Sequence, residues 1–390
     1  MNIVVIHEVG YLSKPVYEYQ DFAERLAHLG HAVTVIDFDE GASGQLRSQI
    51  ISKTGLAEVR LISLPNLGIP VLGVLYARYR FGVELRRFLS TQKVDAVFLY
   101  SVFVNGVSAV KICNQLGVRV VYRVLDAYHQ LRKSAWQSWL LKQGESYIYR
   151  HANILAITNR KMYEYVNQIA VSACAPTVVL DHGVDTRHFQ RTHFDLALAN
   201  KLNISSNDLV AVFLGTTYEF SQLDELISHV PKICDQIPNF KLLIIGAGEL
   251  DQKIRDQITN LNLHDKVVCC GMIDYGKLPQ YLSLAKIGIL PFQINSITKD
   301  IIPIKVLQYL SSSLPVISTP LPDVINHFPM KASGVMYSKS DNLADFVDAL
   351  QSAIKGDHLG ELENLTCEYV RTNYSMDAAT DHLQKILSGT

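Results

Sequence analysis

The chain has 390 residues, of which 48% are hydrophobic, with 36 basic and 37 acidic side chains. A chain of this length and apolar content can bury large cores, and we expect two domains. The net charge of −1 shows no basic excess of the kind that nucleic-acid-binding proteins carry, so we expect no nucleic-acid partner.

Six scattered cysteines lack the spacing of metal ligands, which indicates reduced thiols and no metal site. The start of the sequence lacks the pattern of a signal peptide, and no apolar run reaches the roughly 18 residues of a membrane span. We therefore expect a cytoplasmic protein, and contact with a membrane surface stays open.

The first half of the chain alternates strand-type and helical segments. An apolar run at 3–6, a helical pattern at 16–29 and a second apolar run at 33–36 form a strand–helix–strand unit, which folds as a right-handed crossover. Further strand-type runs follow at 94–100, 118–124 and 153–157. This order predicts a Rossmann-like α/β domain.

The loop after the first strand contains His7 and Gly10 and lacks the G-x-G-x-x-G dinucleotide fingerprint. In parallel sheets, ligands bind at the carboxyl ends of the strands, where this loop begins. We therefore keep two interpretations, a contact with a sugar donor or acceptor and a plain connecting loop.

Two helical segments of the first half, 70–87 and 131–150, combine basic and aromatic residues. Their characteristic side chains are Arg78, Arg80, Arg86, Arg87, Trp136 and Trp139. Such helices suit a membrane interface, where aromatic rings lie at headgroup level and basic residues meet anionic lipid. The alternative is that both helices pack on the domain core with a solvated basic edge.

Asp126 follows the strand-type run at 118–124 by two residues. An acid at the carboxyl end of a parallel strand is well placed for catalysis. Aspartate is also a preferred helix N-cap, so a structural role is the alternative. His129 lies close enough in sequence to support a catalytic aspartate.

A polar stretch at 191–208 is predicted to be a linker, after which a second alternating array begins at 209–214. Glycines follow the later strand-type runs of this array, at Gly246 and Gly271. Glycine at a strand end lets a ligand approach the backbone closely. The array therefore predicts a second Rossmann-like domain with an open edge.

A strand-type run at 287–290 leads into a polar loop, Pro303 and an amphipathic helix. The free N–H groups and the dipole at a helix start favour an anion. Lys305 in the first turn opposes that dipole, and a bound phosphate would account for it. An ordinary surface lysine is the alternative.

The run 300–309, with the letters DIIPIKVLQY, resembles the nucleotide-sugar site of GT-B glycosyltransferases, especially family-4-type enzymes and the xanthan glucuronosyltransferase. The segments 26–36 and 178–189 resemble the first crossover and the end of the first domain in these enzymes. The resemblance implies an α/β protein of the GT-B fold with a cleft between two Rossmann-like domains. It divides the chain into 1–190, which binds the acceptor, 191–372, which binds the nucleotide-sugar, and a last helix, 373–390, that packs back on the first domain.

The resemblance also implies roles for individual residues. Lys305, helped by Lys299, contacts the donor diphosphate, and Gln308 contacts the ribose or a phosphate. Asp300 faces the donor sugar, and Asp126 is the catalytic base, as an aspartate of this region is in the xanthan enzyme. Further substrate contacts are assigned to the strand-end loops, at His7, Gly10, Thr216, Gly246, Gly271, Met272 and Ile273, the last three beside the nucleobase.

The chain departs from the family-4 pattern in two places. The paired glutamates of that family are replaced by Asp300 and Gln308, and the loop 215–221 lacks the Arg and Lys that hold diphosphate there. These departures favour a metal-independent, inverting enzyme, without a cofactor, over a retaining family-4 enzyme. An inactive pseudo-glycosyltransferase that binds a partner or glycan also stays open, and so does an epimerase of the same fold.

We therefore expect a glycosyltransferase that moves a sugar, with glucuronate as one candidate, from a UDP-sugar to a lipid-linked or polysaccharide acceptor. The expected setting is cell-surface glycan (exopolysaccharide) synthesis in the cytoplasm, with peripheral contact at the inner face of the membrane.

Overall fold

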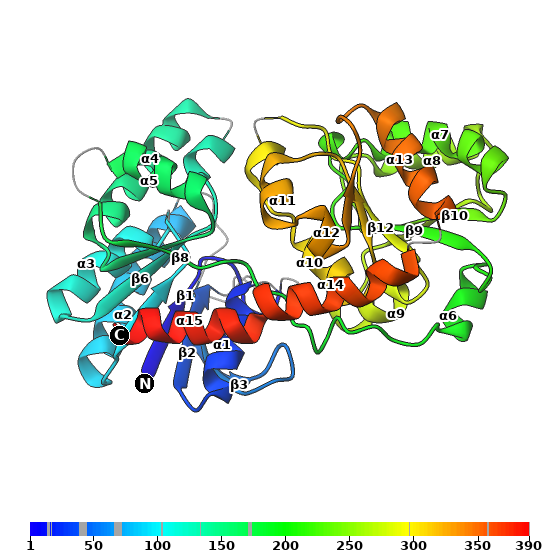
Figure 1. The fold of residues 1–390 in the computed structure, drawn as a ribbon. Coiled ribbons are helices and arrows are strands. Elements are labelled where there is room, and N and C mark those ends of the chain that lie inside the picture. Colours follow the sequence, from blue (N-terminus) through cyan, green and yellow to red (C-terminus); the bar gives the residue numbers. More distant parts are fainter. Residues whose placement is uncertain are drawn as a thin grey trace. The chain divides into compact units, whose positions relative to one another are not determined.

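The computed structural model describes residues 1–13, 16, 18–38, 45–65, 72–102, 104–132, 134–170, 174–295, 297–356 and 359–389. They form two compact units. The first unit contains Met1–His182 together with Met376–Thr390, and the second contains Gly183–Ser375. Each unit has its own β-sheet with helices packed on it (Figure 1).

The units divide a few residues away from the expected limits at 190 and 372. Val184 and Phe189 are buried in the core of the second unit, and the Val184 N–H donates to the carbonyl of Tyr374 over 2.9 Å. The residues that follow His182 therefore belong to the second unit.

The stretch 191–208, predicted to be a linker, contains a short helix and packs on the second unit. Leu196–Lys201 forms the short helix α6, and the side chain of Asp195 accepts a hydrogen bond from the Leu198 N–H at its N-terminus. Ala199 is buried against the core of the second unit. Ile204 belongs to the same core, and Phe194, Leu198 and Leu202 pack against it, so the segment has apolar contacts as well as a helix cap.

The sheet of the first unit has eight strands in the order β3-β4-β2-β1-β5-β6-β7-β8. The strands are β1 (Asn2–Ile6), β2 (Ala32–Phe38), β3 (Arg47–Ile51), β4 (Val59–Leu64), β5 (Ala96–Leu99), β6 (Arg119–Val124), β7 (Ile154–Ile157) and β8 (Thr177–Val179). All neighbours pair in parallel except β3 with β4. The sequence pattern did not predict β3 and β4, which extend one edge of the sheet.

Helices cover both faces of this sheet. They are α1 (Glu18–His28), α2 (Leu72–Thr91), α3 (Gly106–Leu116), α4 (Ala135–His151), α5 (Arg160–Ala170) and α15 (Met376–Ser388). Side chains alternate along a strand, so Val4 and Ile6 pack with α2–α5, while Ile3 and Val5 pack with α1 and α15. The packing of α15 beside α1 confirms that the C-terminal helix belongs to the N-terminal domain (Figure 1).

The helix α2 confirms the helix predicted at 70–87 and has apolar residues on two sides. Ala77, Phe81 and Leu85, spaced by four residues, face the sheet. Leu75 and Tyr79 of the same helix are 59% and 68% exposed. The apolar residues of α2 therefore form two stripes, one in the core and one at the surface.

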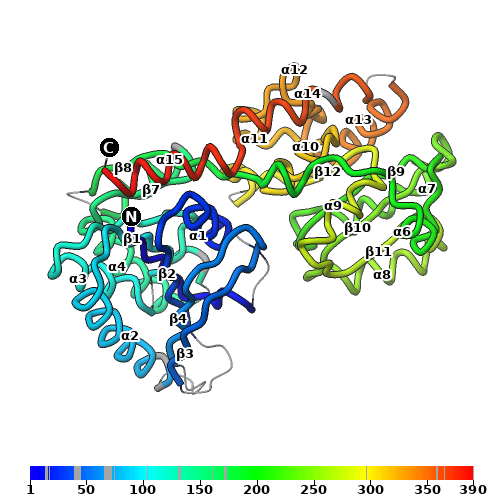
Figure 2. Tube along the Cα trace, turned by 90° about the horizontal axis from the view of Figure 1, so that it is seen from below, coloured from blue at the N-terminus to red at the C-terminus, as the bar shows by residue number. Residues whose placement is uncertain are grey.

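The second unit has a six-stranded parallel sheet in the order β11-β10-β9-β12-β13-β14. Its strands are β9 (Leu209–Leu214), β10 (Phe240–Ile245), β11 (Val267–Gly271), β12 (Ile287–Leu290), β13 (Val316–Ser318) and β14 (Val335–Tyr337). Its longer helices are α7 (Leu223–Gln236), α8 (Asp251–Asn260), α10 (Ile304–Ser311), α13 (Leu343–Lys355) and α14 (Leu359–Asn373). The helices α7 and α8 pack against each other, α7 following β9 and α8 following β10. Figure 2 traces the same elements from another side.

Short helices complete this unit: α9 (Leu278–Leu282), α11 (Pro322–His327) and α12 (Met330–Ser333). None of the helices in the described ranges has the length and apolarity needed to cross a lipid bilayer.

Candidate functional site

Three glycines bring the strand-end loops of the second unit close together. Gly215, Gly246 and Gly271 end or follow β9, β10 and β11, with φ of +120°, +137° and +66°. The Gly246 N–H donates to the Gly271 carbonyl over 2.8 Å, and a Cβ on Gly246 would lie 2.0 Å from the Gly215 carbonyl oxygen. Only glycine fits at position 246, so the carboxyl edge of this sheet presents bare backbone.

Lys305 reaches this edge from α10. Its Nζ lies 3.9 Å from the ring centre of Phe213 and 4.8 Å from that of Phe292. A Cβ on Gly215 would lie 3.0 Å from the same Nζ, so the ammonium group stands directly beside the end of β9. Two aromatic faces stabilise the cation, which is one reason why a lysine is tolerated in the first turn of this helix.

Burial among these groups lowers the pKa of Lys305 to about 7. Among the described residues, no carboxylate forms an ion pair with it. An ammonium group that lacks a counter-ion favours a bound anion, because the anion would replace the solvation that burial removed.

The N-terminus of α10 adds neutral donors to this cation. Pro303 stands at the N-cap and no side chain caps the helix. The Val306 N–H donates to the Pro303 carbonyl over 2.9 Å, whereas in the described structure no such backbone acceptor meets the N–H groups of Ile304 and Lys305. These two N–H groups are therefore open to an anionic ligand, and the helix dipole favours negative charge there. Lys305 and the α10 N-terminus together form a candidate site for a phosphate or diphosphate.

The other residues predicted for this site differ in how far their side chains are exposed. Gln308 is half-buried on α10, Lys299 is exposed and Asp300 half-buried in the short helix Thr298–Asp300, and Thr216 is exposed after β9. Met272 is 68% exposed, whereas Ile273 packs against the core. The structure thus brings Lys305, Gly246 and Gly271 together around Gly215, and the roles of the remaining residues stay predictions.

A polar link between two of these loops was not predicted. The Thr217 hydroxyl donates to Asp251 Oδ1 over 2.7 Å, and the Gly248 N–H donates to the same oxygen over 2.9 Å. This bridge holds the loop after β9 against the loop after β10. The only sequence signal for it is the aspartate in the first turn of α8, which is a common capping position.

In the first unit, Asp126 lies two residues beyond β6, as predicted. The Asp126 side chain is exposed, but nearby protein atoms partly shield its carboxyl group from water. This desolvation raises the pKa of Asp126, and the charge of His182 opposes the shift. The N-cap interpretation is wrong, because the short helix Tyr128–Leu131 begins after Ala127 and has no side-chain cap. A carboxylate with a raised pKa at a strand end is suited to proton transfer.

An ion-paired cluster that the sequence did not reveal lies at the same end of β6 as Asp126. The buried Arg123 donates to both Glu18 oxygens, over 2.7 and 2.8 Å, and His182 Nδ1 lies 2.9 Å from Glu18 Oε2. Arg123 holds the pKa of Glu18 far below its usual range, although burial alone would raise it. The cluster fixes the start of α1 against the carboxyl end of β6.

His129 is the nearest imidazole to Asp126 in sequence. Its Nδ1 lies 2.8 Å from Glu145 Oε2 and 2.7 Å from the Tyr165 hydroxyl. Glu145 is fully buried, and this burial raises its pKa. These contacts orient the imidazole ring, so a structural role is enough to explain the presence of His129.

His7 and Gly10 both take part in packing their own loop. His7 Nδ1 accepts from the Val9 N–H over 3.0 Å, and the ring packs against Tyr19. Burial lowers the pKa of His7 to about 4, so the ring is neutral near pH 7. The Gly10 carbonyl accepts from the Tyr19 hydroxyl over 3.1 Å. Within the ranges that the structure describes, no group of three or more His, Cys, Asp or Glu side chains is placed to hold a metal ion.

Comparison with protein families accounts for most of the chain. Residues 196–372 match the family described as "Glycosyl transferases group 1", and residues 18–180 match the "Glycosyl transferase 4-like domain". The two matches fall in the second and the first unit respectively.

Two curated relatives match part of the chain. The glycosyltransferase MJ1059 of Methanocaldococcus jannaschii, itself uncharacterised, is 26% identical over 188 residues, which is 48% of this chain and 44% of that protein. TuaH of Bacillus subtilis, named as a candidate glycosyltransferase of teichuronic acid biosynthesis, is 27% identical over 119 residues, or 30% of this chain and 29% of that protein. The matches span less than half the length of these relatives.

Two solved structures resemble the chain over nearly its whole length. Sucrose-phosphate synthase from Thermosynechococcus elongatus has a TM-score of 0.74 at 15% identity and covers 99% of this chain and 98% of its own. Alr3699/HepE of Anabaena, in complex with UDP and glucose, has a TM-score of 0.73 at 13% identity with full coverage of both chains. This likeness confirms the predicted fold.

Proposed function

Since the chain belongs to the glycosyltransferases of the GT-B fold, with a 4-like domain in its first unit and a group 1 domain in its second, we propose that it transfers a sugar from a UDP-sugar to an acceptor hydroxyl. The observation that carries the proposal is Lys305, a half-buried cation beside Gly215 at the α10 N-terminus. UDP as the nucleotide of the donor is supported by HepE, which binds UDP and UDP-glucose on the same fold.

The second unit binds the donor in this proposal. The diphosphate lies at the N-terminus of α10, where the first-turn N–H groups and the Lys305 ammonium group contact its oxygens. When the bond between the sugar and the diphosphate breaks, negative charge grows on the leaving oxygen. Donors that are already in place stabilise this charge more in the transition state than in the bound substrate.

The first unit supplies the base. Asp126 accepts the proton of the acceptor hydroxyl while the hydroxyl oxygen attacks the anomeric carbon of the donor and UDP leaves. Its raised pKa brings the carboxylate nearer to the operating pH, which improves proton transfer. A single displacement of this kind inverts the configuration at the anomeric carbon.

The proposed acceptor is a lipid-linked or polysaccharide glycan in cell-surface polymer synthesis, and glucuronate is one candidate sugar. Teichuronic acid, in the name of TuaH, supports a polymer of this class. The basic and aromatic helices α2 and α4 support a protein that works in the cytoplasm at the inner face of the membrane.

A thermal-shift screen with UDP- and GDP-sugars tests the donor. A ligand at about 100 times its Kd stabilises the folded protein by about 2.7 kcal/mol, so UDP-sugars should raise the melting temperature and GDP-sugars should not. Release of UDP from the stabilising donor then measures turnover, and NMR of the product gives its anomeric configuration.

The same experiment separates the competing interpretations. Nucleotide binding without any turnover would favour a pseudo-glycosyltransferase, and a product with the donor's configuration would favour a retaining enzyme in which Asp300 and Gln308 replace the glutamate pair.

A further inference from the structure

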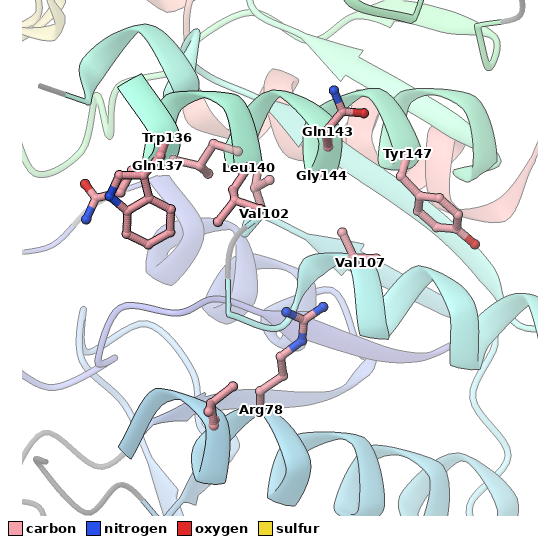
Figure 3. A pocket seen from close by; sticks show the side chains of 11 residues that line it. Arg78, Val102, Val107, Trp136, Gln137, Leu140, Gln143, Gly144 and Tyr147 are labelled. Carbon is pink, nitrogen blue, oxygen red and sulfur yellow. The ribbon is translucent and has the colours of Figure 1, made fainter. Parts of the chain in front are cut away.

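The first unit contains a cavity of about 600 Å³ bounded by α2, α3 and α4 (Figure 3). Trp136 and Leu140 of α4 line it, beside Val102, which follows β5, and Val107 of α3. Both valines pack next to Gly144 of α4. The lining is mostly hydrocarbon. A volume of this size is typical of pockets that hold small-molecule ligands.

Among the described residues that line this cavity, Arg78 is the one with a cationic side chain. Its side chain projects from α2 toward α3 and α4 (Figure 3). Among the described residues it pairs with no carboxylate, whereas Arg80 and Arg87 both pair with Glu84. A guanidinium group at the wall of an apolar cavity favours a ligand that carries a phosphate or carboxylate beside its apolar part.

The helices around the cavity are basic. Together α2, α3 and α4 carry seven Lys and Arg residues and two Glu residues, although acidic and basic residues balance in the whole chain. Of the two acids, Glu84 is paired with Arg80 and Glu145 is fully buried. The surface near the cavity is therefore positive and complements an anionic amphiphile.

The cavity is open at the side formed by α4 and α2. Trp136 is 62% exposed and Leu75 is 59% exposed, although both line it. A peptide partner would need an interface of roughly 1,000 Å² and would bring polar backbone into an apolar cavity. A hydrocarbon chain fills such a cavity without leaving polar groups unpaired.

The cavity also shares a sheet edge with the proposed base. Val102 lies three residues beyond β5, and Asp126 lies two residues beyond β6, its parallel neighbour. The carboxyl ends of parallel strands meet at one edge of the sheet. A lipid in the cavity is therefore bound next to the edge at which the acceptor hydroxyl would be deprotonated.

We propose that the cavity between α2, α3 and α4 binds the hydrocarbon chain of a lipid phosphate and that Arg78 binds its phosphate. The inference rests on the proposed transferase function and specifies its acceptor as a glycan carried on a lipid phosphate, whose sugar provides the hydroxyl, rather than a free polysaccharide. Trp136 covers the chain, and burial of each methylene group stabilises the complex.

The two tryptophans of the chain allow a direct test. Trp136 and Trp139 are 62% and 60% exposed on the same helix, but only Trp136 lines the cavity. Dodecyl phosphate, used below its micelle concentration, is titrated into full-length Trp139→Phe and Trp136→Phe proteins. We expect a saturable blue shift of fluorescence in Trp139→Phe, which keeps Trp136, and no shift in Trp136→Phe.

Arginine variants test the phosphate contact. Arg78→Ala should weaken binding of dodecyl phosphate at least tenfold, because it removes a hydrogen bond to a charged group. It should leave binding of dodecanol unchanged. Arg87→Ala is the matched control, because Arg87 belongs to the same helix and does not line the cavity. Melting curves of all variants show whether each protein is folded.

The inference would be overturned if both tryptophan variants showed the same fluorescence shift, or if both arginine variants lost the same affinity for dodecyl phosphate. Either result would mean that the ligand adsorbs to the surface.

Self-association of the protein through this face would overturn the inference as well. Sedimentation velocity of the wild type and of Trp136→Phe would reveal such self-association. Calorimetry with UDP on the same protein separates the two proposals. UDP binding without dodecyl phosphate binding would overturn the proposed lipid site alone. Dodecyl phosphate binding without UDP binding would overturn the proposal that the donor is a UDP-sugar.

Discussion

At the scale of single residues, the Lys305 ammonium group lies against two aromatic rings and beside the backbone of Gly215. Lys305→Ala should weaken UDP binding by about 1.5–3 kcal/mol, the range for a hydrogen bond to a charged group. Isothermal titration calorimetry at pH 6.5 measures the change. Unchanged affinity would remove α10 from the donor site.

The pH dependence of UDP binding follows from the same group. Its pKa of about 7 means that the free protein loses the Lys305 charge as pH rises above 7. UDP binds the protonated form, so binding at pH 8 should take up a proton, and affinity should fall between pH 7 and pH 9. Calorimetry in buffers of different ionisation enthalpy detects the proton. Lys305→Arg is the control, because arginine stays charged throughout and should flatten the profile.

Substitution of Asp126 tests proton transfer in the proposed reaction rather than the binding of UDP. Asp126→Asn should lower turnover by about 10²–10⁴-fold, the usual cost of losing a general base. UDP affinity and melting temperature should hardly change, because this carboxylate caps no helix in the described structure. A much lower melting temperature would instead assign Asp126 a structural role.

At the scale of elements, α2 has one stripe of apolar residues in the core and basic residues at its surface. Basic residues near an anionic membrane each contribute about 1 kcal/mol to binding. Arg86→Gln combined with Arg87→Gln should therefore reduce flotation with anionic liposomes at low salt. The control is Lys331→Gln with Lys339→Gln, which removes two exposed cations from the second unit. If wild-type protein does not float, membrane contact is ruled out under these conditions.

At the scale of the whole molecule, each unit has its own core, and α15 completes the core of the first. Leu383 of α15 is fully buried, so Leu383→Ala should cost about 2–5 kcal/mol of the first unit's stability. Leu350→Ala, at an equally buried position of α13, should do the same to the second unit. Scanning calorimetry should show a different transition lowered by each variant. A single transition lowered by both would mean that the units unfold together.

The sequence by itself determined the elements and their order. Periodicities of two and of three to four residues identified most strands and helices, because side chains that share a face recur at those intervals. The same patterns placed Asp126 beyond β6 and Lys305 in the first turn of α10, since both positions depend only on where neighbouring elements end. The resemblance to GT-B enzymes added the two-domain order, which the fold confirms.

The tertiary structure alone decided which groups meet. Arg123 and Glu18 are 105 residues apart, and no local pattern connects them. The contact between Lys305 and Gly215 depends on α10 packing next to β9, and the cavity lined by Arg78 and Trp136 depends on three helices that pack on one face of a sheet. Periodicity constrains a residue only relative to its near neighbours, whereas these contacts arise when separate elements bury their apolar faces against a common core.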